Sequence, residues 1–281
     1  KKRHIQSVTI GERVVQRCLC DYALVPMVGR TFIYDNGASM VRKGYDFAIR
    51  RMEHHLRHHF RKHGTDGYIL LFDFSKFFDR VSHSVTKAIF RKEFTDPRII
   101  SLADHFVDAF GEVGLGLGSQ ISQVMALASA NRLDHMCKEV LRIKGYGRYM
   151  DDGYLISESK EYLQECLAKI RTLCDELGIT LNEKKTQIVK ISHGFTYLKA
   201  RFFLLPSGKI VKKIYKRSVT KMRQKLKKFK GLQAAGKLKT EDIDISVTCW
   251  VAYARKFNAW HTTENMIQLF YRLFPKEVLH V

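Results

Sequence analysis

The sequence predicts an α/β protein in which short strands are backed by amphipathic helices. Residues 68–79 open as a continuous apolar run, which is typical of a buried central strand, and residues 145–156 have the pattern of a tight hairpin. Apolar residues recur at helical spacing over residues 82–94, 119–141 and 160–177. A chain of 281 residues is long enough to bury a sizeable core, as one large domain or a few subdomains.

Two adjacent carboxylates lie at the centre of the predicted hairpin, in the run GYGRYMDDGYLI. Met150 and Asp151 would occupy its tight connection, where a short polar residue tolerates unusual backbone angles. Asp151 and Asp152 would then crowd together, and like charges raise each other's pKa unless a cation neutralises them. A solvated turn is one interpretation, since Asp is common in turns, and a site for a hard metal ion is the other.

A third carboxylate, Asp73, follows the apolar run YILLF at the point where the strand would emerge from the core. An ionised carboxylate there needs a partner or a metal to offset its lost hydration. If Asp73 meets Asp151 and Asp152 across neighbouring strands, the three suit a two-cation site. In such a site one metal activates an attacking oxygen and both stabilise the pentavalent phosphoryl transition state. The pattern therefore predicts phosphoryl or nucleotidyl transfer.

Three segments resemble motifs of reverse transcriptases, in the order in which that family carries them. Tyr149, Met150 and the two aspartates that follow are similar to the YxDD box. Residues 73–79 resemble the first palm motif, an Asp followed five residues later by an aromatic. Residues 114–123, GLGLGSQISQ, are similar to the glycine-containing turn and helix start that hold the incoming nucleotide and the template. Weaker matches on either side extend the resemblance over most of the chain.

The resemblance implies a right-hand polymerase fold with fingers, a palm of antiparallel sheet backed by helices, and a helical thumb. It implies an RNA-directed DNA polymerase that makes cDNA by attack of a primer 3′-hydroxyl on the α-phosphate of a dNTP. The partners would be an RNA template, a DNA or RNA primer, and dNTPs. By the same resemblance residues 1–66 would be fingers, 67–90 palm, 91–113 a connection between fingers and palm, 114–207 palm, and 208–281 thumb.

The implied cofactor is a pair of Mg²⁺ ions, for which Mn²⁺ is a substitute. Asp73 and Asp151 would bridge the two ions, Asp152 would assist, and the Phe74 carbonyl would complete one coordination shell. Phe78 would lie under the ribose and exclude a 2′-hydroxyl, which favours deoxynucleotides. Without the family resemblance, Phe78 would be interpreted as a core aromatic.

Other residues would contact the substrates or the leaving group. Residues 181–186, LNEKKT, resemble the palm motif whose lysine protonates the departing pyrophosphate, which implicates Lys185, with the adjacent Lys184 as the alternative. Arg3 resembles a triphosphate contact of the fingers, and its alternative is a surface arginine near a chain end. The remaining substrate-binding positions implied by the resemblance are Leu117, Gly118 and Gln123.

The chain is strongly basic, with 49 Lys and Arg against 28 Asp and Glu and a formal net charge of +21. A field of this sign favours a polyanionic partner, and nucleic acid is the leading choice because basic grooves gain affinity from counterion release. Basic charge alone also fits a ribosomal or chromatin protein. No long apolar or amphipathic segment argues for membrane insertion, so we expect no membrane partner.

Residues 209–230 combine many lysines and arginines with one apolar helical stripe. The stripe comprises Ile214, Val219, Met222, Leu226 and Phe229. With the helical pattern of residues 243–274, it predicts a thumb whose basic side follows a template and primer duplex. A solvated charged face is the competing interpretation. Residues 195–203 resemble the primer-grip hairpin, for which a bare two-stranded hairpin is the alternative.

The six cysteines lack C-x-x-C spacing and are too sparse for a disulfide scaffold, which indicates reduced, mostly structural thiols. The sequence has no signal peptide, so we expect the cytoplasm of a bacterial or phage-infected cell. The chain starts at Lys1 and joins the family pattern partway through. We therefore expect that further fingers residues precede it.

The subtype depends on residues 117–123, LGSQISQ. Intron and retron enzymes usually show Gln-Gly followed by Ser-Pro there, whereas an aliphatic residue before the glycine and Ser-Gln after it resembles bacterial or phage diversity-generating retroelement enzymes. That resemblance implies error-prone copying and allows for a basic accessory protein. Retron-like or phage-defence reverse transcriptases are the alternatives. An alternative from another class is a non-catalytic RNA-binding protein, which would be expected to have lost at least one of the three carboxylates, whereas all three are present here.

Overall fold

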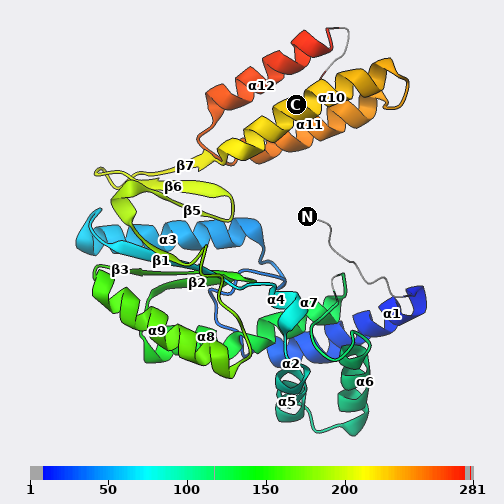
Figure 1. Ribbon diagram of the computed structural model, residues 1–281, viewed down its shortest axis with the longest axis vertical. Coiled ribbons are helices and arrows are strands. Elements are labelled where there is room, and N and C mark those ends of the chain that lie inside the picture. Colours follow the sequence, from blue (N-terminus) through cyan, green and yellow to red (C-terminus); the bar gives the residue numbers. More distant parts are fainter. Residues whose placement is uncertain (1–8, 117, 276–278, 280–281) are drawn as a thin grey trace. The chain divides into compact units, whose positions relative to one another are not determined.

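The computed structural model describes residues 9–116, 118–275 and 279 (Figure 1). The chain divides into two compact units, Lys1–Ile191 and Ser192–Val281, and the described part of each has its own hydrophobic core. None of the helices in the described residues combines the length and the apolar character that a membrane crossing needs.

The first unit joins helices to a four-stranded sheet. Its elements are α1 (Ile10–Leu19), α2 (Val25–Gly29), α3 (Tyr45–His63), β1 (Tyr68–Asp73), α4 (Phe77–Arg80), α5 (His83–Glu93), α6 (Pro97–Asp108), α7 (Gln120–Ser129), α8 (Asn131–His135), β2 (Gly145–Tyr149), β3 (Asp152–Ser157), α9 (Lys160–Glu176) and β4 (Gln187–Lys190). π-helical turns at Cys20–Leu24 and Met136–Val140 follow α1 and α8, and a 3₁₀ turn at Ile191–His193 spans the boundary to the second unit.

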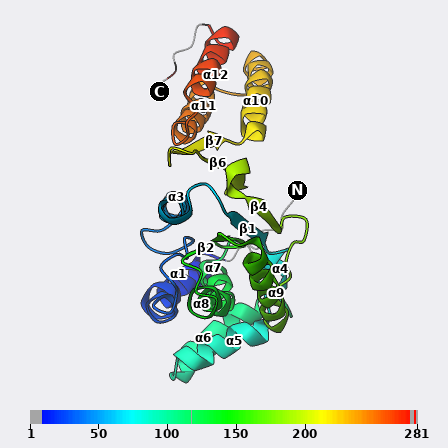
Figure 2. The ribbon, with the colours of Figure 1, turned by 90° about the vertical axis from the view of Figure 1, so that its left-hand side faces the viewer.

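The sheet has the strand order β2-β3-β1-β4, and every neighbouring pair is antiparallel. The predicted central strand and hairpin are confirmed, since β1 lies between β3 and β4, and β2 and β3 are joined by a two-residue turn. Helices α3 and α9 cover opposite faces of the sheet (Figures 1 and 2). Because both faces are covered, β1 is buried along almost its whole length, which accounts for its unbroken apolar run.

Side-chain caps start four helices of the first unit, two of which the sequence predicts. Ser82 accepts a hydrogen bond from the Val85 backbone N–H before α5, Asp96 accepts one from Arg98 before α6, and Ser159 caps α9. Thr9 and Glu12 form a reciprocal capping box at α1. These contacts are local in sequence, so the predicted helices over residues 82–94 and 160–177 are confirmed.

One predicted helix is broken, and the strand after α9 is short. The helix expected over residues 119–141 is broken at Ala130 into α7, α8 and a π-helical turn. Residues 182–186 form a turn in which the Asn182 carbonyl accepts hydrogen bonds from the Lys185 and Thr186 backbone N–H groups, and the strand β4 begins only at Gln187. This turn carries a side chain to the candidate site.

Within its described residues, the second unit contains a three-stranded antiparallel sheet and three helices. Its elements are β5 (Phe195–Tyr197), β6 (Ala200–Leu204), β7 (Ile210–Ile214), α10 (Lys216–Ala234), α11 (Thr240–Ala254) and α12 (Trp260–Leu273). The predicted hairpin at residues 195–203 is confirmed, and it gains β7 as a third strand. The predicted apolar helical stripe is confirmed in part: Val219, Met222 and Leu226 of α10 pack in the core of this unit, whereas Ile214 lies in β7 because the helix begins only at Lys216.

The division between the units follows Ile191, because β6 hydrogen-bonds with both β5 and β7 and so joins residues 195–204 to the second unit. The end of the predicted palm segment therefore belongs to the second unit by its contacts. The names fingers, palm and thumb for these segments stay predictions. The six cysteines are free thiols, and four of them, Cys20, Cys137, Cys166 and Cys174, are buried.

Candidate active site

The three predicted carboxylates lie at the same end of two neighbouring strands. Asp73, the last residue of β1, pairs directly with Asp152, the first residue of β3. Asp151 precedes Asp152 in the turn, and its carbonyl accepts a 3.1 Å hydrogen bond from the Phe74 backbone N–H. The antiparallel register therefore brings together residues that stand almost 80 positions apart in the chain.

Local backbone features let the hairpin take this shape. Met150 has a φ of +54°, a left-handed conformation that is uncommon for a residue with a side chain. Gly153, opposite Phe72, has no side chain, and an added Cβ would lie 2.1 Å from Phe72 Cζ. The Phe72 ring therefore fills the space beside Gly153, immediately after the two aspartates.

Asp73 is almost completely buried, at 4% exposure, and its carboxylate is held by two side chains. Lys185 Nζ lies 2.6 Å from Asp73 Oδ2, and Asn182 Nδ2 donates to Oδ1 at 2.9 Å. The Asn182 backbone N–H also donates to the Asp73 carbonyl at 2.8 Å. Both lysines considered from the sequence are exposed, and the ion pair with Asp73 is made by Lys185. Asn182 was missed as a site residue, although it is the Asn of the LNxxKT pattern.

Charge crowding changes the ionisation of the site. Burial, together with the charges of Asp151 and Asp73, raises the pKa of Asp152 to about 7. Partial burial lowers the pKa of Lys185, but its hydrogen bond with Asp73 and the charges of the three aspartates outweigh this effect and raise it. Near neutral pH the site therefore carries a protonated lysine beside a carboxyl group that is only partly ionised.

The donor set fits a hard divalent cation. The side-chain oxygens of Asp73 and Asp152 come from paired positions, and their like-charge repulsion is relieved when a cation binds between carboxylates. Among the residues that the structure describes, no three His, Cys, Asp or Glu side chains are already gathered as a metal site. The Asp73 carboxylate is instead paired with the Lys185 ammonium group.

The loop before α7 lies against the segment that follows Asp73. The Leu115 backbone N–H donates to the Phe78 carbonyl at 2.7 Å, and the Gly114 backbone N–H donates to the Val81 carbonyl at 2.9 Å. Gly114 has a φ of +88°, and a Cβ there would lie 2.9 Å from the Asp79 carbonyl oxygen. Two segments with predicted nucleotide-binding residues are thus joined by backbone contacts.

The remaining predicted site residues have different degrees of exposure. The Phe78 ring is half-buried and lies edge-on to Phe77, with 6.0 Å between the ring centroids. Tyr149 is half-buried and pairs with Asp152 across β2 and β3. Gly118 and Gln123 are exposed, and Gln123 Oε1 accepts a 2.8 Å hydrogen bond from Ser39. Arg3 and Leu117 lie outside the described residues.

The sequence analysis missed a buried ion pair directly behind the hairpin. Arg148, in β2, pairs with Asp134 of α8, and both side chains have an exposure of 0%. A charged residue inside an otherwise apolar strand segment is the signal that points to Arg148. Its acidic partner lies 14 residues away in a helix, and no local pattern identifies it.

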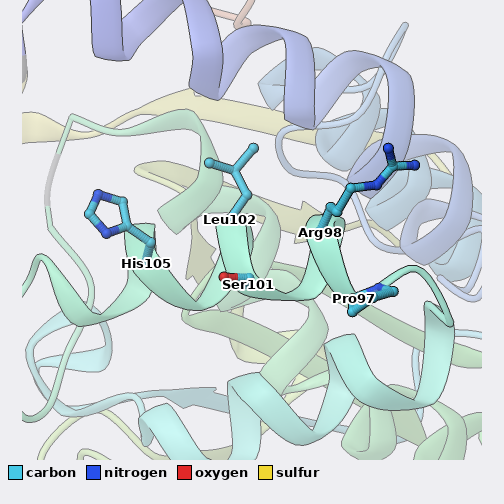
Figure 3. Close-up of a pocket in the computed structure, with 5 residues that line it drawn as sticks. All are labelled: Pro97, Arg98, Ser101, Leu102 and His105. Atoms are coloured by element: carbon cyan, nitrogen blue, oxygen red, sulfur yellow. The ribbon is translucent and has the colours of Figure 1, made fainter.

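A separate open hollow of about 550 Å³ lies along α6 (Figure 3). Its lining residues are Pro97, Arg98, Ser101, Leu102 and His105. None of the predicted site residues that the structure describes lines this hollow.

Comparisons with known proteins identify the family. A family model described as reverse transcriptase (RNA-dependent DNA polymerase) matches residues 3–202. Apo telomerase from Candida tropicalis, truncated from its C-terminal domain, is 17% identical with a TM-score of 0.51, over 72% of this chain and 44% of that one. Telomerase from Candida albicans in complex with a fragment of telomeric RNA is 11% identical with a TM-score of 0.50, over 94% and 55%. No curated protein sequence matches.

At these identities the likeness to telomerase shows the fold alone, and it confirms the predicted α/β polymerase fold. The chain spans about half the length of the telomerases that it matches. The family model covers most of the chain, including all three carboxylates and the loop before α7. The chain therefore belongs to the reverse transcriptase (RNA-dependent DNA polymerase) family.

Proposed function

We propose that this protein is an RNA-directed DNA polymerase that extends a primer on an RNA template. The observation that carries the proposal is the direct pairing of Asp73 with Asp152 across β1 and β3, with Asp151 in the adjoining turn. The reaction joins the primer 3′-hydroxyl to the α-phosphate of a dNTP and releases pyrophosphate. Family membership supports the same reaction.

Two Mg²⁺ ions would be held by Asp73, Asp151 and Asp152, with the Phe74 carbonyl as a further ligand and Mn²⁺ as a substitute. When bound, they would supply activation of the primer hydroxyl and stabilisation of charge on the phosphoryl group. Lys185, which stays protonated beside Asp73, has the charge and position to give a proton to the leaving pyrophosphate. In this proposal the Asp73 carboxylate, which is paired with Lys185 in this structure, would bind a metal ion in place of part of that ion pair.

The remaining predicted residues would bind substrates. Phe78 would exclude the 2′-hydroxyl of a ribonucleotide, Arg3 would contact the triphosphate, and Gly118 and Gln123 would border the nucleotide and template. The backbone contact between Leu115 and Phe78 supports the grouping of these segments. In the second unit, the basic face of α10 would bind the phosphates of the template and primer duplex.

The decisive test compares Asp151→Asn with the parent on a primed RNA template. We expect dNTP incorporation to be abolished and RNA binding to remain, because the charge is needed for metal ions and not for the fold. Asp175→Asn, at an exposed position of α9, is the matched control and should keep parental activity. Near-parental extension by Asp151→Asn would overturn the metal assignment. If the parent itself binds RNA but incorporates no dNTP, the alternative of a non-catalytic RNA-binding protein is favoured.

For the subtype, we propose a diversity-generating retroelement enzyme of bacterial or phage origin, acting in the cytoplasm with a basic accessory protein. Leu117 stands where related polymerases carry a glutamine that hydrogen-bonds near the nucleotide sugar, and its aliphatic side chain cannot make that bond. One net hydrogen bond is worth on the order of 1 kcal/mol, so its loss would relax nucleotide discrimination by roughly tenfold or less.

Misincorporation opposite each template base tests this subtype. We expect frequent errors opposite template adenine in the parent and fewer in Leu117→Gln. Uniformly low error in the parent, or no change in the variant, would favour the retron-like or phage-defence alternatives. Errors are counted in DNA that the enzyme has already made. A low error frequency would therefore argue against the subtype and leave the polymerase activity itself established.

A further inference from the structure

The buried ion pair behind the hairpin is unusually well connected. Arg148 Nη2 lies 2.6 Å from Asp134 Oδ2, and Nε lies 2.7 Å from Oδ1. The Tyr146 hydroxyl donates to the same Oδ1 at 2.5 Å. Burial and the charge of Asp134 raise the pKa of Tyr146 well above its usual value, so the hydroxyl keeps its proton and remains a donor.

The rest of the guanidinium group binds backbone. Nη1 donates to the Met150 carbonyl at 2.8 Å, and Nη2 also donates to the Leu127 carbonyl, near the end of α7, at 3.2 Å. Met150 is the residue with left-handed backbone angles, and such a conformation persists only where the surroundings enforce it. Arg148 therefore ties the turn that carries Asp151 to two helices of the core.

The backbone of Arg148 is held as well. Its N–H donates to the Asp35 carbonyl at 3.2 Å, and its own carbonyl accepts from the Gly37 N–H at 2.8 Å. The segment around Asn36 thus covers the open edge of β2 beside the hairpin. With backbone and side chain both fixed, Arg148 cannot shift without moving the Met150 carbonyl.

The presence of a buried ion pair in this position is not explained by a gain in folding stability. Removing two charges from water carries a large desolvation cost for each ion, and replacing a buried pair with apolar residues of similar volume is often neutral or stabilising. The planar guanidinium group of arginine does fix relative positions. Two of its N–H groups bind a carboxylate, while its other N–H groups point at backbone carbonyls. A lysine has the charge but not this planar arrangement.

We propose that Arg148 and Asp134 form a positioning device that holds the Met150 carbonyl and thereby keeps Asp151 and Asp152 in register with Asp73. The inference rests on the proposed function, in which these carboxylates bind the catalytic metal ions. Arg148 touches no reacting atom, so its role is to place the metal ligands. A purely structural role for the pair is the competing explanation.

The main test is the double variant Arg148→Met with Asp134→Leu, which removes both charges and leaves no buried ion unpaired. We expect it to fold with a lowered unfolding midpoint, because the buried Tyr146 hydroxyl loses its acceptor, and its activity is measured well below that midpoint. We expect kcat for dNTP incorporation to fall roughly 100-fold, as for a misplacement of about 1 Å. Mn²⁺ binding, followed by electron paramagnetic resonance without substrate, should weaken, while the KM for dNTP changes little.

Two further variants make the result decisive. The matched control is Arg91→Met with Asp104→Leu, which removes a 2.6 Å ion pair between α5 and α6 and should keep parental kcat and Mn²⁺ binding. Arg148→Lys keeps the charge beside Asp134 but loses the planar guanidinium group, so we expect a folded protein with reduced kcat and weaker Mn²⁺ binding.

The outcomes separate this proposal from the proposed function. A folded double variant or Arg148→Lys variant with parental kcat and Mn²⁺ binding would show that the pair is only structural. Failure of both variants to fold would show that the pair holds the fold itself, and would also overturn the proposal. A parent that neither incorporates dNTP nor binds Mn²⁺ would instead refute the polymerase function.

Discussion

Asp73 and Asp152 face each other across β1 and β3, but their charges are compensated differently. Asp73 is neutralised by Lys185 and receives a hydrogen bond from Asn182, so its burial is offset. Asp152 is crowded by two other carboxylates, and its pKa rises to about 7. A divalent cation would change this balance most at Asp152, because it would favour the ionised form.

The raised pKa of Asp152 predicts a pH-dependent stability in the absence of divalent cations. In the unfolded chain its pKa returns to about 3.9, so between about pH 4 and 7 the folded state binds the proton more tightly. The contribution of Asp152 to the free energy of unfolding therefore falls as pH rises through this window. Urea unfolding of the parent and Asp152→Asn in EDTA, at pH values from about 5 to 8, measures the effect.

We expect the variant to gain stability relative to the parent as pH rises, because asparagine has no proton to lose. Added Mg²⁺ should reduce that difference by stabilising the ionised carboxylate. A stability difference that stays constant across the range would contradict the assigned crowding of Asp152.

Phe78 tests the sugar selectivity of the proposed site. Phe78→Val should admit ribonucleotides by opening space for the 2′-hydroxyl, and we expect the ratio of rNTP to dNTP incorporation to rise roughly tenfold or more. Single-nucleotide incorporation kinetics with matched rNTP and dNTP pairs measure this ratio. Phe77→Leu is the control, since Phe77 is a buried core residue next to it. An unchanged ratio in Phe78→Val would mean that Phe78 is only a packing residue.

At the scale of the element, α10 has one buried and one basic face. Its buried residues include Val219, Met222 and Leu226, while the lysines and arginines along the helix are exposed. Arg217, Lys221 and Lys228 are spaced to lie along one side of the helix. The predicted amphipathic basic helix is therefore confirmed from Lys216 onward. Its contact with a template and primer duplex stays a prediction.

Replacing Arg217, Lys221 and Lys228 with glutamine should weaken binding of a template and primer duplex and reduce its salt dependence. Each lost phosphate contact lowers the slope of log K against log salt by roughly 0.7 to 0.9, so the expected total is about 2 to 3. Fluorescence anisotropy over a salt series measures the slope. The control replaces Lys92, Lys160 and Lys169, which are exposed in the first unit, with the same change of net charge. An equal slope in both triple variants would argue against a duplex on α10.

At the scale of the whole molecule, the family match and the division into units do not coincide. The match covers residues 3–202 and ends within β6, whereas the second unit begins at Ser192 and continues through α12. Family membership therefore rests on the first unit and the start of the second. The helices α10 to α12 form a separate core, and their proposed role rests on their own charge and packing.

Much of the fold was predictable because its signals are local. The buried strand β1 follows from an unbroken apolar run, and the helix starts follow from caps at Ser82, Asp96 and Ser159. The hairpin with its two aspartates follows from a short turn between β-prone segments. Each signal depends on residues a few positions apart, so the amino-acid sequence is sufficient to reveal it.

The sequence by itself determined the family and the identity of the three carboxylates, because their motifs are continuous runs in a set order. Only the tertiary structure decided that Lys185 and not Lys184 reaches Asp73, that helix 119–141 breaks at Ala130, and that β5 and β6 join the second unit. It also decided the partner of Arg148. These outcomes depend on which distant groups meet in the core, where an unpaired charge or backbone group is costly, and no local pattern encodes that pairing.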